Sequence, residues 1–138
     1  SLLKYSLVVP EARRILRIFK KRNYKLAIAS NRPQKFTNLL LNHLDLRKYF
    51  DLVVCARNEE EIKPNPKILL QALEKLNAKK QEAFYVGDMT IDVRAGRNAG
   101  IRTIAILGGS SSKEQLKQAK PFRIIKKFSR LLDLINNS

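Results

Sequence analysis

The fold is decided by the stretch Phe84-Tyr85-Val86-Gly87-Asp88-Met89-Thr90-Ile91-Asp92-Val93-Arg94-Ala95-Gly96-Arg97-Asn98-Ala99-Gly100. A short apolar run meets Gly87, two carboxylates follow at Asp88 and Asp92, and a helical pattern continues to Gly100. Glycine often follows the last turn of a helix, because it adopts a left-handed backbone without strain. The stretch therefore predicts a strand, a tight turn with an acidic pair, and a helix.

The acidic pair has two interpretations. With Asp88 at the strand end and Asp92 on the first helical turn, both carboxylates can face one point, where oxygen ligands suit Mg²⁺. Acidic side chains also cap helix N-termini without any metal. This stretch alone leaves both interpretations open.

Strand and helix patterns alternate along the rest of the chain. Apolar runs predict strands at 25–30, 51–56, 83–86, 102–107 and 122–125. Amphipathic runs predict helices at 11–22, 31–44, 64–76, 113–119 and 128–135, besides the helix that ends at Ala99. Because the strands are short and almost wholly apolar, we expect an α/β domain whose parallel sheet is covered by helices on both faces.

Two helices show their expected orientation in the sequence. In the helix at 11–22, the core stripe is Ala12, Ile15, Leu16 and Phe19, and the basic residues between them form a solvated face. In the helix at 31–44, Phe36, Leu40 and Leu44 share one face. For His43 at the end of that helix we expect a partly buried packing or capping role, because no acidic or thiol partner accompanies it.

Composition bounds the class of protein. The chain has 138 residues, enough for one domain with its own core, and its single cysteine, Cys55, cannot form an internal disulfide. No apolar run is long enough to span a bilayer. We expect a soluble protein of the cytoplasm with a buried thiol at Cys55 and no membrane partner.

The charge is strongly positive. Twenty-eight Lys and Arg against twelve Asp and Glu give a formal net charge of +16, which raises nucleic acid as a partner. The basic residues are spread along the chain, however, and no helix-turn-helix, zinc-finger or aromatic RNA-binding motif is present. The pattern favours attraction of an anionic small substrate over nucleic-acid binding.

Parallel sheets bind ligands at the carboxyl ends of their strands, and suitable side chains recur there. Ser30 and Asn31 offer a hydroxyl and backbone N–H groups at a helix start, which can hold an anion. Lys63 places a cation just before a helix opened by proline. Singly, Ser30 is explained as a helix cap and Lys63 as a surface lysine. Together with Asp88 and Asp92, they predict a site for a metal-bound phosphate, with the Gly108-Gly109 loop as a plain turn near its rim.

These segments, in this order, resemble the motifs of the haloacid dehalogenase superfamily of phosphohydrolases, most closely its phosphoglycolate-phosphatase-like branch. Residues 26–33 resemble the second motif, a strand whose final Ser or Thr binds the phosphoryl group. Residues 62–66 resemble the third motif, whose lysine steadies the charge of phosphate and nucleophile, and residues 87–92 the fourth, an acidic pair that holds Mg²⁺. The resemblance runs from about residue 10 to the C-terminus.

The resemblance implies a fold and a set of roles. The fold is a Rossmann-like, three-layer α/β core. The catalytic residues are Lys63 and Ser30, the substrate-binding residues are Ser30, Asn31 and Lys63, and the ligands of Mg²⁺ are Asp88 and Asp92. The implied reaction is Mg²⁺-dependent hydrolysis of a small phosphomonoester through an aspartyl-phosphate intermediate.

One motif of the family is missing. Family members open with a strand ending in Asp-x-Asp, whose first Asp attacks phosphorus, and this sequence contains no Asp-x-Asp. We expect that strand and the cap domain to precede Ser1. Residues 1–138 would then be a single, N-terminally incomplete core domain, with residues 1–9 as the remnant of the cap-to-core connection. Such a fragment is expected to bind metal and phosphate weakly and to hydrolyse nothing.

The missing strand would lie between the strands that end at Ser30 and Asp88. Its absence leaves two apolar edges, which invite pairing with another chain. We expect either direct pairing of these two strands or association through their edges, including self-association. Two other functions stay open: a non-catalytic phosphate- or anion-binding relative, and a basic nucleic-acid-binding domain.

Overall fold

The computed structural model describes residues 9–136, and the predicted remnant at 1–9 lies almost wholly outside them. The helices are α2 (Val9–Lys21), α3 (Gln34–His43), α4 (Lys67–Leu76), α5 (Thr90–Ala99), α6 (Lys113–Ala119) and α7 (Arg130–Asn136). The strands are β1 (Ala27–Ser30), β2 (Leu52–Cys55), β3 (Phe84–Gly87), β4 (Arg102–Ile106) and β5 (Arg123–Ile125). Short 3-10 turns are η2 (Arg47–Tyr49), η3 (Glu59–Glu61) and η4 (Lys80–Glu82).

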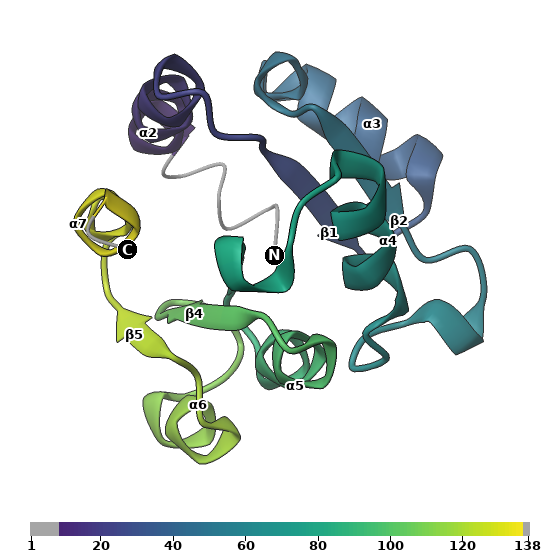
Figure 1. Cartoon of the computed structure of the whole chain (residues 1–138), viewed down its shortest axis with the longest axis vertical. Helices are drawn as coiled ribbons and strands as arrows, with labels where there is room; N and C mark the ends of the chain where they lie inside the picture. Colours follow the sequence, from purple (N-terminus) through teal and green to yellow (C-terminus); the bar gives the residue numbers. More distant parts are fainter. Residues whose placement is uncertain (1–8, 137–138) are drawn as a thin grey trace.

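The strands form two parallel sheets. β1 pairs with β2, and β3, β4 and β5 form the second sheet with β4 in the centre (Figure 1). Within residues 9–136, β1 and β3 are not paired with each other. Of the two alternatives expected for these strands, direct pairing is therefore wrong, and association through their edges stays a prediction.

One helical layer covers both sheets on the same side. Leu16 of α2 packs in a cluster with Ile28 of β1, whereas Ile15 and Phe19 of the same helix pack with Ile104 of β4. The predicted core stripe of this helix is confirmed, since all four of its residues are buried. Helix α2 therefore contacts both sheets, with α3 beside it over the first sheet and α7 over the second (Figure 1).

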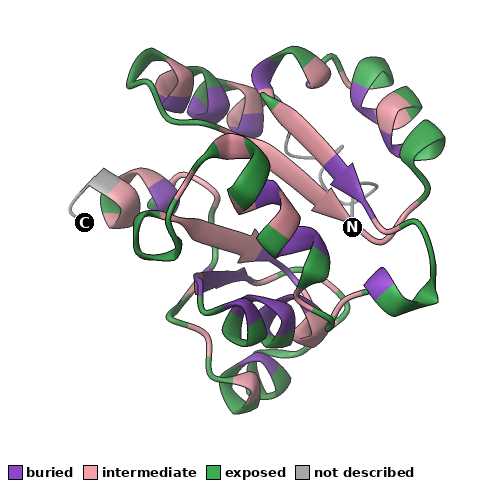
Figure 2. Cartoon of the chain, turned by 45° about the vertical axis from the view of Figure 1, so that its right-hand side comes forward, coloured by how far each residue is buried: buried purple, intermediate pink, exposed green. Residues whose placement is uncertain are grey.

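The opposite side is covered by α4, α5 and α6. Leu69 of α4 and Ala95 of α5 share a cluster with Ala29 of β1 and Tyr85 of β3, so this layer also joins the two sheets. Purple, buried positions in Figure 2 lie on the sides of these helices that face the strands. The α/β fold with three layers is confirmed, and helices on both faces fix the spacing between the sheets.

The orientation expected for the helix at 31–44 is only partly right. The fully buried residues of α3 are Thr37 and Leu41, whereas Phe36 is 46% exposed. The Phe36 ring instead lies under the guanidinium of Arg32, 5.5 Å from its centroid. His43 is exposed, so the expected partly buried role for it is wrong. The spacing of apolar residues on a short helix defines the rotation of the helix about its axis only to within about one residue. In α3, the packing of Leu41 with Val53 of β2 decides this rotation.

Asp51 fastens the first sheet to α2. Its carboxylate accepts hydrogen bonds from Lys20 Nζ at 2.8 Å and from the N–H of Leu26 at 2.7 Å. The N–H of Asp51 donates to the carbonyl of Leu26 at 2.7 Å. The bond from Lys20, followed by that from Leu26, lowers the pKa of the Asp51 carboxyl. These contacts set where β1 and β2 begin.

We expect the two sheets to differ in how strongly their backbone amides are protected from hydrogen exchange. β4 has a partner strand on each side, whereas β1 has one among the described residues. We expect the amides of β4 to exchange slowest, and those amides of β1 that point away from β2 to exchange faster. Hydrogen exchange followed by NMR on a dilute sample measures this. Uniformly slow exchange across β1 at that dilution would contradict it.

Candidate functional site

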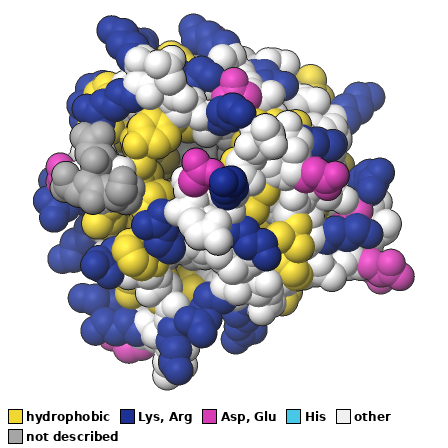
Figure 3. Space-filling view, viewed as in Figure 1, with side chains coloured by type: hydrophobic (Ala, Val, Ile, Leu, Met, Phe, Trp, Pro, Cys, Tyr) yellow, Lys and Arg dark blue, Asp and Glu magenta, His cyan; other side chains and the backbone are white. Residues whose placement is uncertain are grey.

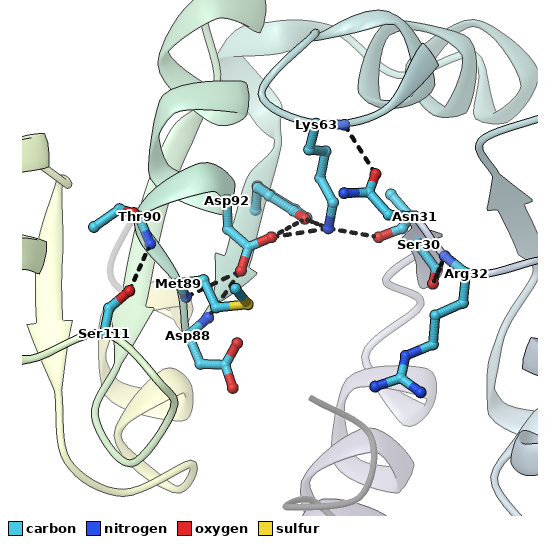
Figure 4. Close-up of polar contacts among 11 residues, drawn as sticks. Ser30, Asn31, Arg32, Lys63, Asp88, Met89, Thr90, Asp92 and Ser111 are labelled. Atoms are coloured by element: carbon cyan, nitrogen blue, oxygen red, sulfur yellow. Dashed lines mark hydrogen bonds and ion pairs between the residues drawn. The ribbon is translucent and has the colours of Figure 1, made fainter. Parts of the chain in front are cut away.

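Lys63 lies at the centre of the site. Its side chain is only 10% exposed, and Nζ donates to Asp92 Oδ1 at 2.8 Å, to the Tyr85 hydroxyl at 2.8 Å and to the carbonyl of Ala29 at 3.2 Å (Figure 4). An ammonium group has three N–H donors, and these three bonds use all of them. Because Ala29 belongs to β1 and Tyr85 to β3, Lys63 joins the carboxyl ends of the two sheets.

The Asp92 carboxylate forms an ion pair with Lys63 and also caps the N-terminus of α5. Its Oδ1 accepts from Lys63 and, at 3.1 Å, from the Tyr85 hydroxyl. Its Oδ2 accepts the backbone N–H groups of Asp88 at 3.2 Å and Met89 at 3.1 Å. Helix capping is thus one real role of Asp92. Its assignment as a metal ligand stays a prediction, and a bond to metal would replace one of these contacts.

Two glycines make room for the acidic residues. A Cβ on Gly87 would lie 2.6 Å from Cγ of Asp92, and a Cβ on Gly109 would lie 2.7 Å from Cγ of Asp88. Both distances are too short for real carbon contacts. The Gly108-Gly109 loop was expected to be a plain turn near the rim of the site, and Gly109 does lie directly against Asp88.

Asp88 directly follows β3 and is 7% exposed. Figure 4 shows its carboxylate pointing away from the contact between Lys63 and Asp92. The two predicted metal ligands therefore share a backbone turn, but their carboxylates have different surroundings. The Asp92 carboxylate is taken up by bonds within the site, to Lys63, Tyr85 and two backbone N–H groups.

Ser30 and Asn31 complete the site from the end of β1. Ser30 Oγ accepts the N–H of Arg32 at 3.0 Å, and a hydroxyl in this role still has its own proton to donate. Asn31 Oδ1 accepts the backbone N–H of Lys63 at 2.8 Å. The structure thus brings Ser30, Asn31 and Lys63 together as the sequence predicted, and gives the Asn31 side chain a positioning role that the sequence did not show.

The loop before Lys63 is anchored by a buried carboxylate. Glu61 is 1% exposed and accepts from the N–H of Arg57 at 2.8 Å, from the Arg57 guanidinium at 3.1 Å and from Gln71 at 3.5 Å. The guanidinium of Arg57 is the main cause that lowers the pKa of Glu61 to about 2. The signal available in the sequence for this anchor was the pair of opposite charges at Arg57 and Glu61, four residues apart.

The carboxylates at this site fit a cation such as Mg²⁺, which takes oxygen ligands and obtains some of them from water or phosphate. Among residues 9–136, no three His, Cys, Asp or Glu side chains gather at one point. Mg²⁺ is commonly held by one or two carboxylates together with waters and phosphate oxygens. Buried Asp88 is a suitable oxygen donor of that kind, with Asp92 behind it.

A model of the haloacid dehalogenase-like hydrolase family matches residues 4–106. The chain belongs to this family. The predicted membership of this superfamily and of its phosphoglycolate-phosphatase-like branch is confirmed by the relatives as well. Pyrophosphatase PpaX from Bacillus cereus strain G9842 is 35% identical over 122 residues, which cover 88% of this chain and 56% of that protein.

Solved structures agree. The crystal structure of a predicted phosphatase from Clostridium acetobutylicum has a TM-score of 0.83 and 26% identity, covering 91% of this chain and 58% of that one. A predicted phosphoglycolate phosphatase from Haemophilus somnus has a TM-score of 0.83 and 25% identity, covering 91% and 56%. The chain spans just over half the length of the relatives it matches. In the part that the structure describes, no helix is long and apolar enough to cross a membrane.

Tyr85 is a residue that sequence analysis missed, and its hydroxyl can be tested. Tyr85→Phe removes a group that accepts from Lys63 and donates to Asp92. We expect the free energy of unfolding to fall by about 1–2 kcal/mol, because two buried charged groups lose a partner. Urea denaturation measures it. The matched control is Tyr49→Phe, whose hydroxyl has only a 3.5 Å contact with Arg17, and a loss no larger than the control's would contradict the role.

Glu61 predicts a pH-dependent stability. Its folded pKa of about 2 lies below the ordinary 4.5, so the ionised form favours the folded state. This contribution is full above pH 4.5 and is lost as the pH falls toward 2. We expect Glu61→Gln to lower the melting temperature at pH 7 and to match the original protein progressively below pH 4.5. Glu60→Gln, at an exposed position, is the control; a constant difference between Glu61→Gln and the original protein at all pH values would contradict the prediction.

Proposed function

We propose that this chain forms the phosphate- and metal-binding core of a phosphomonoester hydrolase. The observation that carries the proposal is the position of Lys63, which is buried between the carboxyl ends of β1 and β3 with Ser30 on one side and Asp88 on the other (Figure 4). Membership of a hydrolase family, and relatives named phosphatase and pyrophosphatase, support it. The substrate is a small phosphorylated molecule.

The chain's own residues would bind the phosphoryl group from two directions. Ser30 donates its hydroxyl proton to one oxygen, and the N–H of Asn31 donates to another. Lys63 supplies positive charge, but its three donors are already bonded. Direct contact with phosphate therefore requires it to release one bond, and the 3.2 Å contact with Ala29 is the longest.

Asp88 would hold Mg²⁺, and Asp92 would support it from behind while keeping Lys63 in place. When bound, the cation supplies charge that neutralises phosphoryl oxygens as negative charge develops. Asp92 and Tyr85 act as positioning residues, since both contact Lys63.

The attacking group is not among these 138 residues, because the sequence contains no Asp-x-Asp. We propose that the reaction proceeds through an aspartyl-phosphate on a carboxylate supplied from outside them. The same observation favours an alternative, a non-catalytic protein that binds phosphate at this site. Nucleic-acid binding is less well supported, because Lys and Arg are spread around the face in Figure 3 and form no single stripe there.

We also propose that residues 1–138 form one core domain in the cytoplasm, without a membrane partner. The edges of β1 and β3 that face each other are where a further strand, or a second copy of the chain, would pair.

Metal dependence separates these functions. We expect the affinity for inorganic phosphate to rise when Mg²⁺ is added, and Asp88→Asn to weaken Mg²⁺ binding about tenfold or more, because a carboxylate ligand is lost. Isothermal titration calorimetry measures both. Asp45→Asn, which likewise removes one carboxylate but at an exposed position away from the site, is the control and should behave like the original chain. Phosphate binding that ignores both Mg²⁺ and Asp88→Asn would favour the non-catalytic alternative.

A further inference from the structure

A basic pocket lies on the outer side of α5. Its cavity of about 370 Å³ is lined by Pro64, Arg94, Arg97, Asn98, Gln118, Ala119 and Lys120, which we call the basic pocket. Three of the seven lining residues are cationic and none is acidic. None of them is among the residues that form the candidate active site.

The helices orient these side chains. Arg94, Arg97 and Asn98 are three and four residues apart on α5 and therefore share one exposed face. Lys120 directly follows α6, at its C-cap, with a left-handed backbone of φ 62°. The Arg97 guanidinium donates to the Lys120 carbonyl at 3.0 Å, which holds one arginine at the pocket before any ligand binds.

We propose that the basic pocket binds a small anion with two phosphoryl groups, of the diphosphate class. Guanidinium groups suit phosphate oxygens because they donate two parallel hydrogen bonds, and Lys120 adds a point charge. Asn98 and Gln118 offer amide donors. The cavity falls within the range of small-molecule sites, roughly 300–1,000 Å³, and three cations match the charge of a diphosphate better than that of a single phosphate.

The pocket is connected to the loop that carries Lys63. Asn98 Nδ2 donates to the carbonyl of Pro64 at 3.1 Å, and Pro64 directly follows Lys63. A bound diphosphate would therefore bridge this loop, α5 and α6. This site goes beyond the proposed function and does not depend on it.

Inorganic diphosphate, added to the ¹⁵N-labelled chain without divalent metal, tests the proposal. We expect saturable shifts of the amide signals of residues 97–98 and 118–120. Arg94→Gln should weaken binding about tenfold, because a charged hydrogen-bond donor is lost. Lys120→Gly should weaken it similarly while keeping the fold, since glycine suits φ 62°. Arg14→Gln, at an exposed position on α2, removes the same charge elsewhere and should change nothing.

Three results would overturn the proposal: saturable shifts confined to Ser30, Asn31 and their neighbours, shifts over all basic surfaces without saturation, or equal affinity in both variants and the control. If Arg94→Gln does not fold, Lys120→Gly decides alone. Failure here leaves the Mg²⁺-dependent effect of Asp88→Asn untouched, so the two proposals fail separately.

Discussion

The buried ion pair between Lys63 and Asp92 is the contact on which the site depends. Charged groups this far from water are stable only when paired and hydrogen-bonded, and here the Tyr85 hydroxyl and two backbone N–H groups complete the set. Because the bonds of Lys63 reach both β1 and β3, the pair also joins two sheets that share no strand pairing within residues 9–136. The Lys63 side chain therefore lies in the candidate site and at the same time joins the two sheets.

Much of the surrounding structure serves to hold this lysine. Asn31 accepts the backbone N–H of Lys63 from the end of β1, and Glu61 anchors the preceding loop through Arg57. On the other side, Gly87 allows Asp92 to approach β3 closely. These contacts fix the position of the Lys63 cation, and a charge that is held in place in this way is preorganised.

The same loop faces two different surroundings. Lys63 points inward to its carboxylate partner, while Pro64 lines the basic pocket beside α5. Cationic side chains on this protein thus occur in two kinds of surroundings. Lys63 is a buried cation whose donors are all bonded, whereas Arg94, Arg97 and Lys120 lie at exposed positions around the pocket between α5 and α6. The net charge of +16 therefore says little by itself about where an anion binds.

The sequence by itself determined the order of strands and helices along the chain and the α/β class, because apolar periodicity and turn residues act locally. It also named Ser30, Asn31, Lys63, Asp88 and Asp92 as candidate site residues, through their resemblance to the motifs of the family. Only the tertiary structure decided the separation into two sheets, the exposure of Phe36, and the roles of Tyr85, Glu61 and Gly109. Those features depend on contacts between segments far apart in the chain, such as Lys63 with Asp92, which no local pattern specifies. Burial then gives each polar group its role, since a group removed from water must find its partner inside the fold.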